Sequence, residues 1–126
     1  MANTRIFVSF AIEDETIKNL FLGQAKHDRV PYDFVDMSVK QPWDRAWKTN
    51  CRTRIKGCHG VIVLITKHLK RGEGALWEIR CAKEERIPII GVYMKDATIL
   101  DSPTELDGIK KISWTWDGIA IFVNNL

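Results

Sequence analysis

The sequence predicts an α/β fold of the three-layer, flavodoxin-like type, with a five-stranded parallel sheet in the order 2-1-3-4-5 and helices on both faces. Strand-like runs alternate along the chain with segments whose apolar residues recur at helical spacing. Two of these runs, 61–65 and 87–93, are apolar almost throughout, which is typical of strands buried on both faces. The length of 126 residues, 45% of them hydrophobic, suits a single domain over residues 1–126 with a sizeable core.

The first third of the chain predicts two strands separated by a helix. Residues 5–10 form a β-rich run, and the acidic residues 13–15 suit a helix N-terminus. Helical spacing follows at Ile17, Leu20, Phe21 and Gln24. Val30 and Pro31 end that helix, and residues 32–36 alternate as a second strand does.

The middle of the chain predicts a second helix, which leads into the most apolar strand. Pro42 suits the first turn of this helix, which we expect to run to about Lys56. Four residues spaced by four predict one face of it: Trp43, Trp47, Cys51 and Ile55. Gly57 and Gly60 bracket its end, before the strand at 61–65.

The remaining elements continue the alternation of strand and helix. We expect a loop at 66–74, a helix from about Ala75 to Glu85, a strand at 87–93, a loop at 95–108 with a turn after Pro103, an edge strand at 112–114 and a last helix at 117–125. In a sheet of this order, ligands bind outside the carboxyl ends of the strands, at the switch point between the first and third strands. Four stretches should meet there: 9–14, 36–47, 66–74 and the start of the helix that holds Trp77 and Glu78.

Several functional classes are excluded or weakened by the sequence. There is no P-loop, GxGxxG or GxSxG motif, and the strand ends lack the aspartates of a phosphoacceptor domain. The cysteines Cys51, Cys58 and Cys81 have neither disulfide nor zinc spacing, so we expect buried thiols and no metal site. A net charge of +3 is too small to indicate nucleic-acid binding. No leader or membrane span is apparent, so we expect a cytoplasmic protein with no membrane partner.

The candidate residues each allow two interpretations. Glu78 is either a carboxylate favoured by the helix dipole or a functional acid. Asp36 and Ser38 suit a turn, and the tryptophans suit either the core or a wall for a planar ligand. The basic residues Lys48, Arg52, Arg54 and Lys56 form either a solvated face or a phosphate contact.

An ordered set of motifs resembles the TIR domain, and more narrowly the bacterial TIR-like proteins of the Thoeris anti-phage system (the ThsB-like group). The motifs are Arg5-Ile-Phe-Val-Ser-Phe10, Phe34-Val-Asp36-x-Ser38, Trp43 with Trp47, Gly60-Val-Ile-Val-Leu-Ile65, Leu76-Trp-Glu-Ile79 and Pro88-Ile-Ile-Gly-Val92. The resemblance implies a TIR fold and an NAD+ nucleosidase or cyclase, which makes a nucleotide derived from ADP-ribose that activates a separate effector. It implies self-association on activation, and NAD+ as a substrate rather than a bound cofactor.

The same resemblance implies roles for particular residues. Glu78, preceded by a tryptophan and followed by an aliphatic residue, matches the catalytic glutamate of the family. The implied pocket residues are Ser9, Phe10 and Ala11 beside the nicotinamide ribose, Asp36, Ser38, Trp43 and Trp47 in the loop wall, Trp77 next to the glutamate, and Lys48 or Arg52 at the pyrophosphate.

A single carboxylate suits this substrate, because nicotinamide leaves as a neutral amine and needs no general acid, unlike the leaving group of an ordinary glycoside. Three alternatives stay open. The first is a non-catalytic TIR interaction module that acts by self-association. The second is an enzyme resembling nucleoside deoxyribosyltransferases, with Glu78 as nucleophile, and the third is nucleic-acid binding through the basic helix.

Overall fold

A five-stranded, all-parallel sheet forms the centre of the molecule in the computed structural model, which describes residues 3–126. The strands are β1 (Arg5–Ser9), β2 (Asp33–Val35), β3 (Gly60–Ile65), β4 (Ile89–Tyr93) and β5 (Lys111–Ser113). Their order across the sheet is β2-β1-β3-β4-β5, with β1 in register with both β2 and β3. The predicted fold class and strand order are confirmed.

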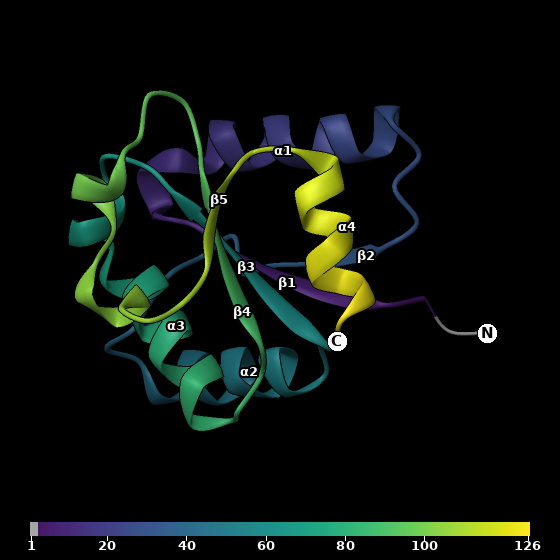
Figure 1. The fold of residues 1–126 in the computed structure, drawn as a ribbon. Coiled ribbons are helices and arrows are strands. Elements are labelled where there is room, and N and C mark those ends of the chain that lie inside the picture. The colour runs from purple at the N-terminus through teal and green to yellow at the C-terminus, as the bar shows by residue number, and fades with distance from the viewer. Residues whose placement is uncertain (1–2) are drawn as a thin grey trace.

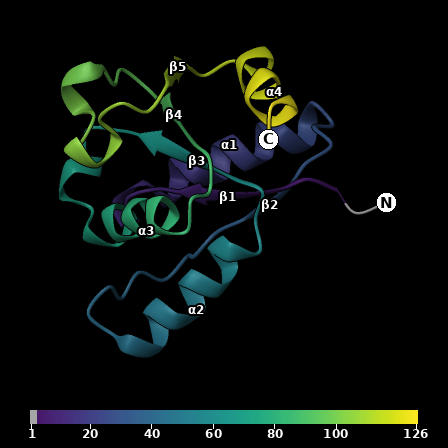
Figure 2. The ribbon, with the colours of Figure 1, turned by 60° about the horizontal axis from the view of Figure 1, so that its bottom comes forward.

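In the part of the chain that the structure describes, four helices cover the two faces of this sheet. They are α1 (Glu15–His27), α2 (Arg45–Lys56), α3 (Glu73–Glu84) and α4 (Trp116–Asn124). Figures 1 and 2 show α2 and α3 on one side of the sheet and α1 and α4 on the other. Short 3-10 turns lie in the connections at Ile12–Asp14, Leu69–Arg71, Ile99–Asp101 and Thr104–Leu106. The last of these is the turn that we expected after Pro103.

The sheet separates two hydrophobic clusters, because successive residues of a strand point to opposite faces. Phe7, Val61 and Val63 face α2 and α3, where they pack with Ile55 and Ile79. On the other face, a second cluster joins strand residues to α1 and α4: Ile6, Val8, Ile62, Leu64, Phe21, Ile119 and Val123. All six residues of β3 are buried, as its apolar run predicts.

The start of α2 differs from the sequence prediction. The helix begins at Arg45, because the carboxylate of Asp44 accepts a hydrogen bond from the backbone N–H of Ala46 and caps it. Pro42 and Trp43 therefore lie in the turn before the helix, and Trp43 is 75% exposed. Of the four residues predicted to form one helical face, the structure buries Trp47, Cys51 and Ile55 and leaves out Trp43.

Other boundaries moved by one to three residues. The second strand is shorter than predicted, and β4 begins after Pro88, which lacks the N–H that a strand needs. The three cysteines are buried free thiols, as expected. None of the helices within residues 3–126 combines the length and the apolar character that crossing a membrane requires.

Candidate active site

Glu78 lies on the buried stripe of α3, beside the carboxyl end of β1. The stripe consists of Ala75, Glu78, Ile79 and Ala82, which recur at the spacing that places residues on one face of a helix. Because the other three are small or apolar and face the sheet, the carboxylate of Glu78 faces it too. Its side chain has no solvent-exposed surface.

Three side chains from three other segments contact this carboxylate. The Ser9 hydroxyl, at the end of β1, donates to Glu78 Oε1 over 2.8 Å. The Lys40 ammonium, from the connection between β2 and α2, lies 3.0 Å from Oε1 and 2.7 Å from Oε2. The thiol of Cys51, on α2, donates weakly to Oε2 over 3.9 Å. Glu78 is therefore a buried acid whose oxygens are all engaged by donors of the protein itself.

Two opposing influences act on the ionisation of Glu78. Burial raises the pKa of Glu78, because the charged form loses its hydration. The ammonium of Lys40 and the hydrogen bonds from Lys40 and Ser9 act in the opposite direction and lower the pKa of Glu78. The net direction is upward, so burial outweighs these partners.

Phe10 and Ala11 continue from β1 and are fully buried. The Lys40 ammonium lies 4.1 Å from the centre of the Phe10 ring, within range for a cation–π interaction. The ammonium of Lys18 lies 5.3 Å from the same ring and forms an ion pair with Asp36 at 3.0 Å. Two lysines thus lie within cation–π range of the Phe10 ring, and each is paired with its own carboxylate.

Three of the tryptophans lie on or next to α2 and α3. The rings of Trp47 and Trp77 pack edge to face, 5.4 Å apart, where α2 meets α3. The indole N–H of Trp47 donates to the carbonyl of Val39 over 2.5 Å and so ties the segment 36–44 to α2. Trp43 instead borders an open hollow of about 420 Å³, whose other lining residues are Pro42, Lys48, Glu73, Leu76, Trp77 and Arg80. Ser38 is exposed and lies in the same segment.

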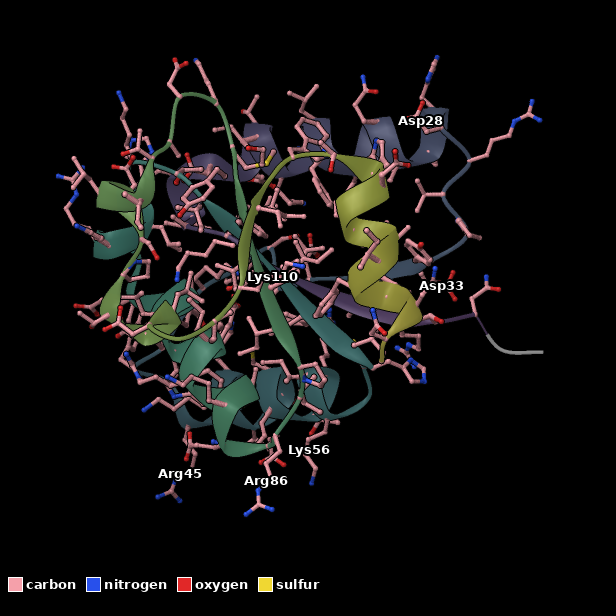
Figure 3. The ribbon with its side chains drawn as sticks, in the orientation of Figure 1. Asp28, Asp33, Arg45, Lys56, Arg86 and Lys110 are labelled. Atoms are coloured by element: carbon pink, nitrogen blue, oxygen red, sulfur yellow. The ribbon has the colours of Figure 1, made fainter. Side chains whose placement is uncertain are left out.

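The basic residues of α2 also separate. Lys48 borders the hollow beside Trp43. Arg52 pairs with Glu85 at 2.5 Å and Glu84 at 3.4 Å, and its guanidinium lies 5.6 Å from the Trp77 ring. Arg54 donates to the carbonyl of Asp36 over 2.8 Å. Figure 3 shows Arg45 and Lys56 of α2 pointing outward, away from the sheet, and Arg86, just after α3, does the same.

A second polar cluster lies at the same edge of the sheet, around the buried carboxylate of Asp14. Thr66 Oγ1 donates to one oxygen of Asp14, and Nδ1 of His68 lies 2.9 Å from the other. These contacts join the start of α1 to the segment after β3. Within residues 3–126, no group of three His, Cys, Asp or Glu side chains lies close enough to hold a metal ion.

Lys40 and the cluster at Asp14 were missed by the sequence analysis. Lys40 lies in a short polar connection with no periodicity, and its partner is 38 positions away. The sequence did carry one sign that Glu78 has a partner. Glu78 is a charged residue on an otherwise apolar helical stripe, and such a residue is rarely buried without a partner. Among the candidates, the structure brings Ser9 and Phe10 to Glu78 or its bound lysine, and places Arg52 in a separate ion-pair network.

Comparison with known proteins identified a matching family and similar solved structures. The family model described as the Thoeris protein ThsB, TIR-like domain, matches residues 7–99. A solved prokaryotic SEFIR domain aligns with a TM-score of 0.56 at 15% identity, covering 97% of this chain and 88% of that one, which shows a shared fold. A 3-dehydroquinate dehydratase-like protein from Bifidobacterium longum aligns at 12% identity over 97% of this chain and 94% of that chain, with a TM-score of 0.42 that carries no argument. The search of curated proteins gave no match.

Proposed function

This chain belongs to the Thoeris ThsB family of TIR-like domains, and on that premise we propose that it cleaves the bond between nicotinamide and ribose in NAD+. Membership implies a role in Thoeris anti-phage defence. The observation that carries the proposed chemistry is the buried carboxylate of Glu78, held by Ser9 at the carboxyl edge of the sheet. That is where sheets of this order bind their ligands.

The proposed reaction needs one carboxylate and no acid. The C1′–N bond breaks, and its electron pair moves to the pyridinium nitrogen, so that nicotinamide leaves as a neutral molecule. Positive charge then develops on the ribose. A buried carboxylate that accepts hydrogen bonds from the ribose hydroxyls interacts more strongly as this charge grows, which is how a site stabilises a transition state.

The ribose cation is then captured by a nucleophile. Water gives ADP-ribose and a proton, whereas a nucleophilic atom of the same nucleotide gives a cyclic isomer. We propose the cyclic outcome, with the product acting as a signal to a separate effector. Exclusion of water and close placement of the internal nucleophile favour it. Phe10 and Ala11 are fully buried after β1, and the Phe10 ring lies 4.1 Å from the Lys40 ammonium that contacts Glu78; we propose that these two residues supply an apolar wall for this purpose.

The surrounding segment completes the proposed site. Asp36, Ser38, Trp43 and Trp47 belong to or anchor the connection between β2 and α2, and we propose that they close over the nucleotide. Lys48 is proposed at the pyrophosphate, since it borders the hollow beside Trp43 and makes no ion pair within residues 3–126. Self-association of the domain on activation is part of the same proposal.

Mass spectrometry of NAD+ incubated with concentrated protein tests the function. Nicotinamide and a nucleotide derived from ADP-ribose should form with the wild type and be at least about 100-fold less abundant with Glu78→Gln. Glu84→Gln is the matched control, because Glu84 is an exposed glutamate of the same helix. A product one water lighter than ADP-ribose identifies cyclisation.

Two results would contradict the proposal. Equal product from wild type and Glu78→Gln would remove the catalytic role of the carboxylate. No consumption of NAD+ by the wild type, even in lysate of phage-infected cells, would instead favour an interaction module that acts by self-association.

A further inference from the structure

The carboxylate that the proposed reaction requires is covered by the protein's own lysine. The side chains of Lys40 and Glu78 are 4% and 0% exposed, and the ammonium contacts both carboxylate oxygens. Ser9 donates to one of those oxygens as well. The ribose hydroxyls of a nucleotide need the same oxygens, so nucleotide and lysine compete for Glu78.

The Lys40 ammonium also carries the same sign of charge as the ribose cation of the proposed reaction, and it lies against the same carboxylate. It lies 2.7 Å from Glu78 Oε2 and 4.1 Å from the centre of the Phe10 ring. Glu78 is positioned to favour a positive group at that point, and Lys40 supplies one without any substrate. Lys40 and Glu78 therefore neutralise each other without any nucleotide.

The backbone that carries Lys40 lies tightly against α3. A methyl group added at Gly74 would lie 2.7 Å from Cβ of Lys40, closer than any ordinary contact. Close approach of the lysine to the helix thus depends on a glycine at position 74. On its other side, the segment is tied down by the bond from Trp47 to the carbonyl of Val39.

Part of this segment is exposed. Val39, next to Lys40, is 60% exposed and Trp43, three residues beyond it, is 75% exposed, so these two residues add little apolar burial, whereas Met37 at the start of the segment is buried in the core. The ion pair with Glu78 and the single bond from Trp47 are the main specific contacts that hold residues 38–43 over the site. A segment with few buried contacts can open at a free energy well below that of global unfolding.

We propose that Lys40 is a removable plug: its ammonium occupies the ribose subsite of Glu78, and residues 38–43 must withdraw before NAD+ can bind. This inference rests on the proposed function, since it concerns regulation of the same site. The apparent affinity for NAD+ is then the affinity of the open form, reduced by the fraction of molecules that are open. Any event that draws the segment away from α3 switches the enzyme on.

Steady-state kinetics of NAD+ cleavage with two plug variants tests the inference. Lys40→Met keeps the length of the stem but removes the charge, and leaves Glu78 unpaired in the closed form. Gly74→Ala keeps both members of the ion pair, but its new methyl group pushes the lysine backbone outward. Both should raise kcat/KM about tenfold or more, mainly through a lower KM, because the chemistry of the open form is unchanged. Lys56→Met, at an exposed lysine of α2, is the control.

A direct readout of opening accompanies the kinetics. Hydrogen exchange of the Trp47 indole N–H, followed by NMR, reports the bond to Val39 that holds the segment closed. Exchange should be faster in Gly74→Ala than in the wild type, and should become faster in the wild type when NAD+ is added. These changes are independent of product formation.

The outcomes separate failure of the plug from failure of the enzyme. Suppose that Glu78→Gln abolishes turnover but Lys40→Met raises the KM for NAD+. Lys40 would then bind the substrate, and the proposal that it blocks the site would be overturned. Unchanged kinetics together with unchanged Trp47 exchange in Gly74→Ala would overturn it as well. Absence of product in every variant, including those with an open segment, would overturn the proposed function itself.

Discussion

Two opposing effects, burial and the charge of Lys40, determine the pKa of Glu78. Burial raises the pKa of Glu78 above the ordinary value of 4.5, and Lys40 is the largest influence in the opposite direction. The proposed chemistry uses the ionised carboxylate, which predominates only above that raised pKa. The rate of NAD+ cleavage should therefore fall as the pH decreases, with an apparent pKa above 4.5.

The pH profile of kcat/KM checks this expectation, since it reports groups of the free enzyme. In Lys40→Met the acidic limb should move to higher pH, because the neighbouring positive charge that favours the carboxylate is gone. A limb at or below pH 4.5, or a move to lower pH in the variant, would contradict the assignment. Lys56→Met, whose side chain points outward from α2, should leave the profile unchanged.

At the scale of elements, the packing of α2 against α3 gives two neighbouring cations different roles. Lys48 borders the open hollow beside Trp43, whereas Arg52 is held by Glu84 and Glu85 at the far end of α3. We expect Lys48→Met to raise KM for NAD+ about tenfold, the loss expected for one charge-assisted contact with a phosphate.

Arg52→Met should instead leave KM within about twofold and lower the free energy of unfolding by about 0.2–1 kcal/mol, the range for a partly exposed ion pair. Kinetics and urea unfolding of the two variants measure both quantities. A raised KM in Arg52→Met with unchanged stability would place the pyrophosphate on Arg52.

Sequence periodicity predicted elements well where the side chains have a repeating environment. The stripe of α3 and the apolar run of β3 were readable because burial on one or both faces leaves a regular pattern. The start of α2 was predicted wrongly. The spacing of Trp43 and Trp47 suggested that both lie on one helical face, whereas the cap by Asp44 depends on local backbone geometry. The position of a cap outweighs an apparent repeat at a helix end.

At the scale of the whole molecule, the strand order was predictable, and with it the edge of the sheet where we place the proposed site, because handedness and parallel pairing permit few arrangements. Lys40 was not, because its role depends on a loop that places a residue 38 positions from Glu78 onto it. The same holds for His68 and Asp14, which are 54 positions apart. Contacts made by irregular segments leave no period in the sequence.

The sheet also divides the stability of the molecule between two cores, and this can be measured. Phe21 of α1 packs 5.1–5.6 Å from the rings of Phe34, Trp114 and Trp116 on one face, while Ile55 of α2 is buried on the other. Phe21→Leu should cost about 1–3 kcal/mol of unfolding free energy and Ile55→Val about 0.5–1.5 kcal/mol.

Urea unfolding of the two single variants and the double variant measures how far these cores depend on each other. Because α1 and α2 lie on opposite sides of the sheet, the two costs should add within about 0.5 kcal/mol. A coupling of more than about 1 kcal/mol would mean that strain passes through β1 and β3 from one face to the other. The strands that end beside Glu78 would then be a route by which changes on the α1 face reach the proposed site, whereas additivity would show that the two cores contribute to stability independently.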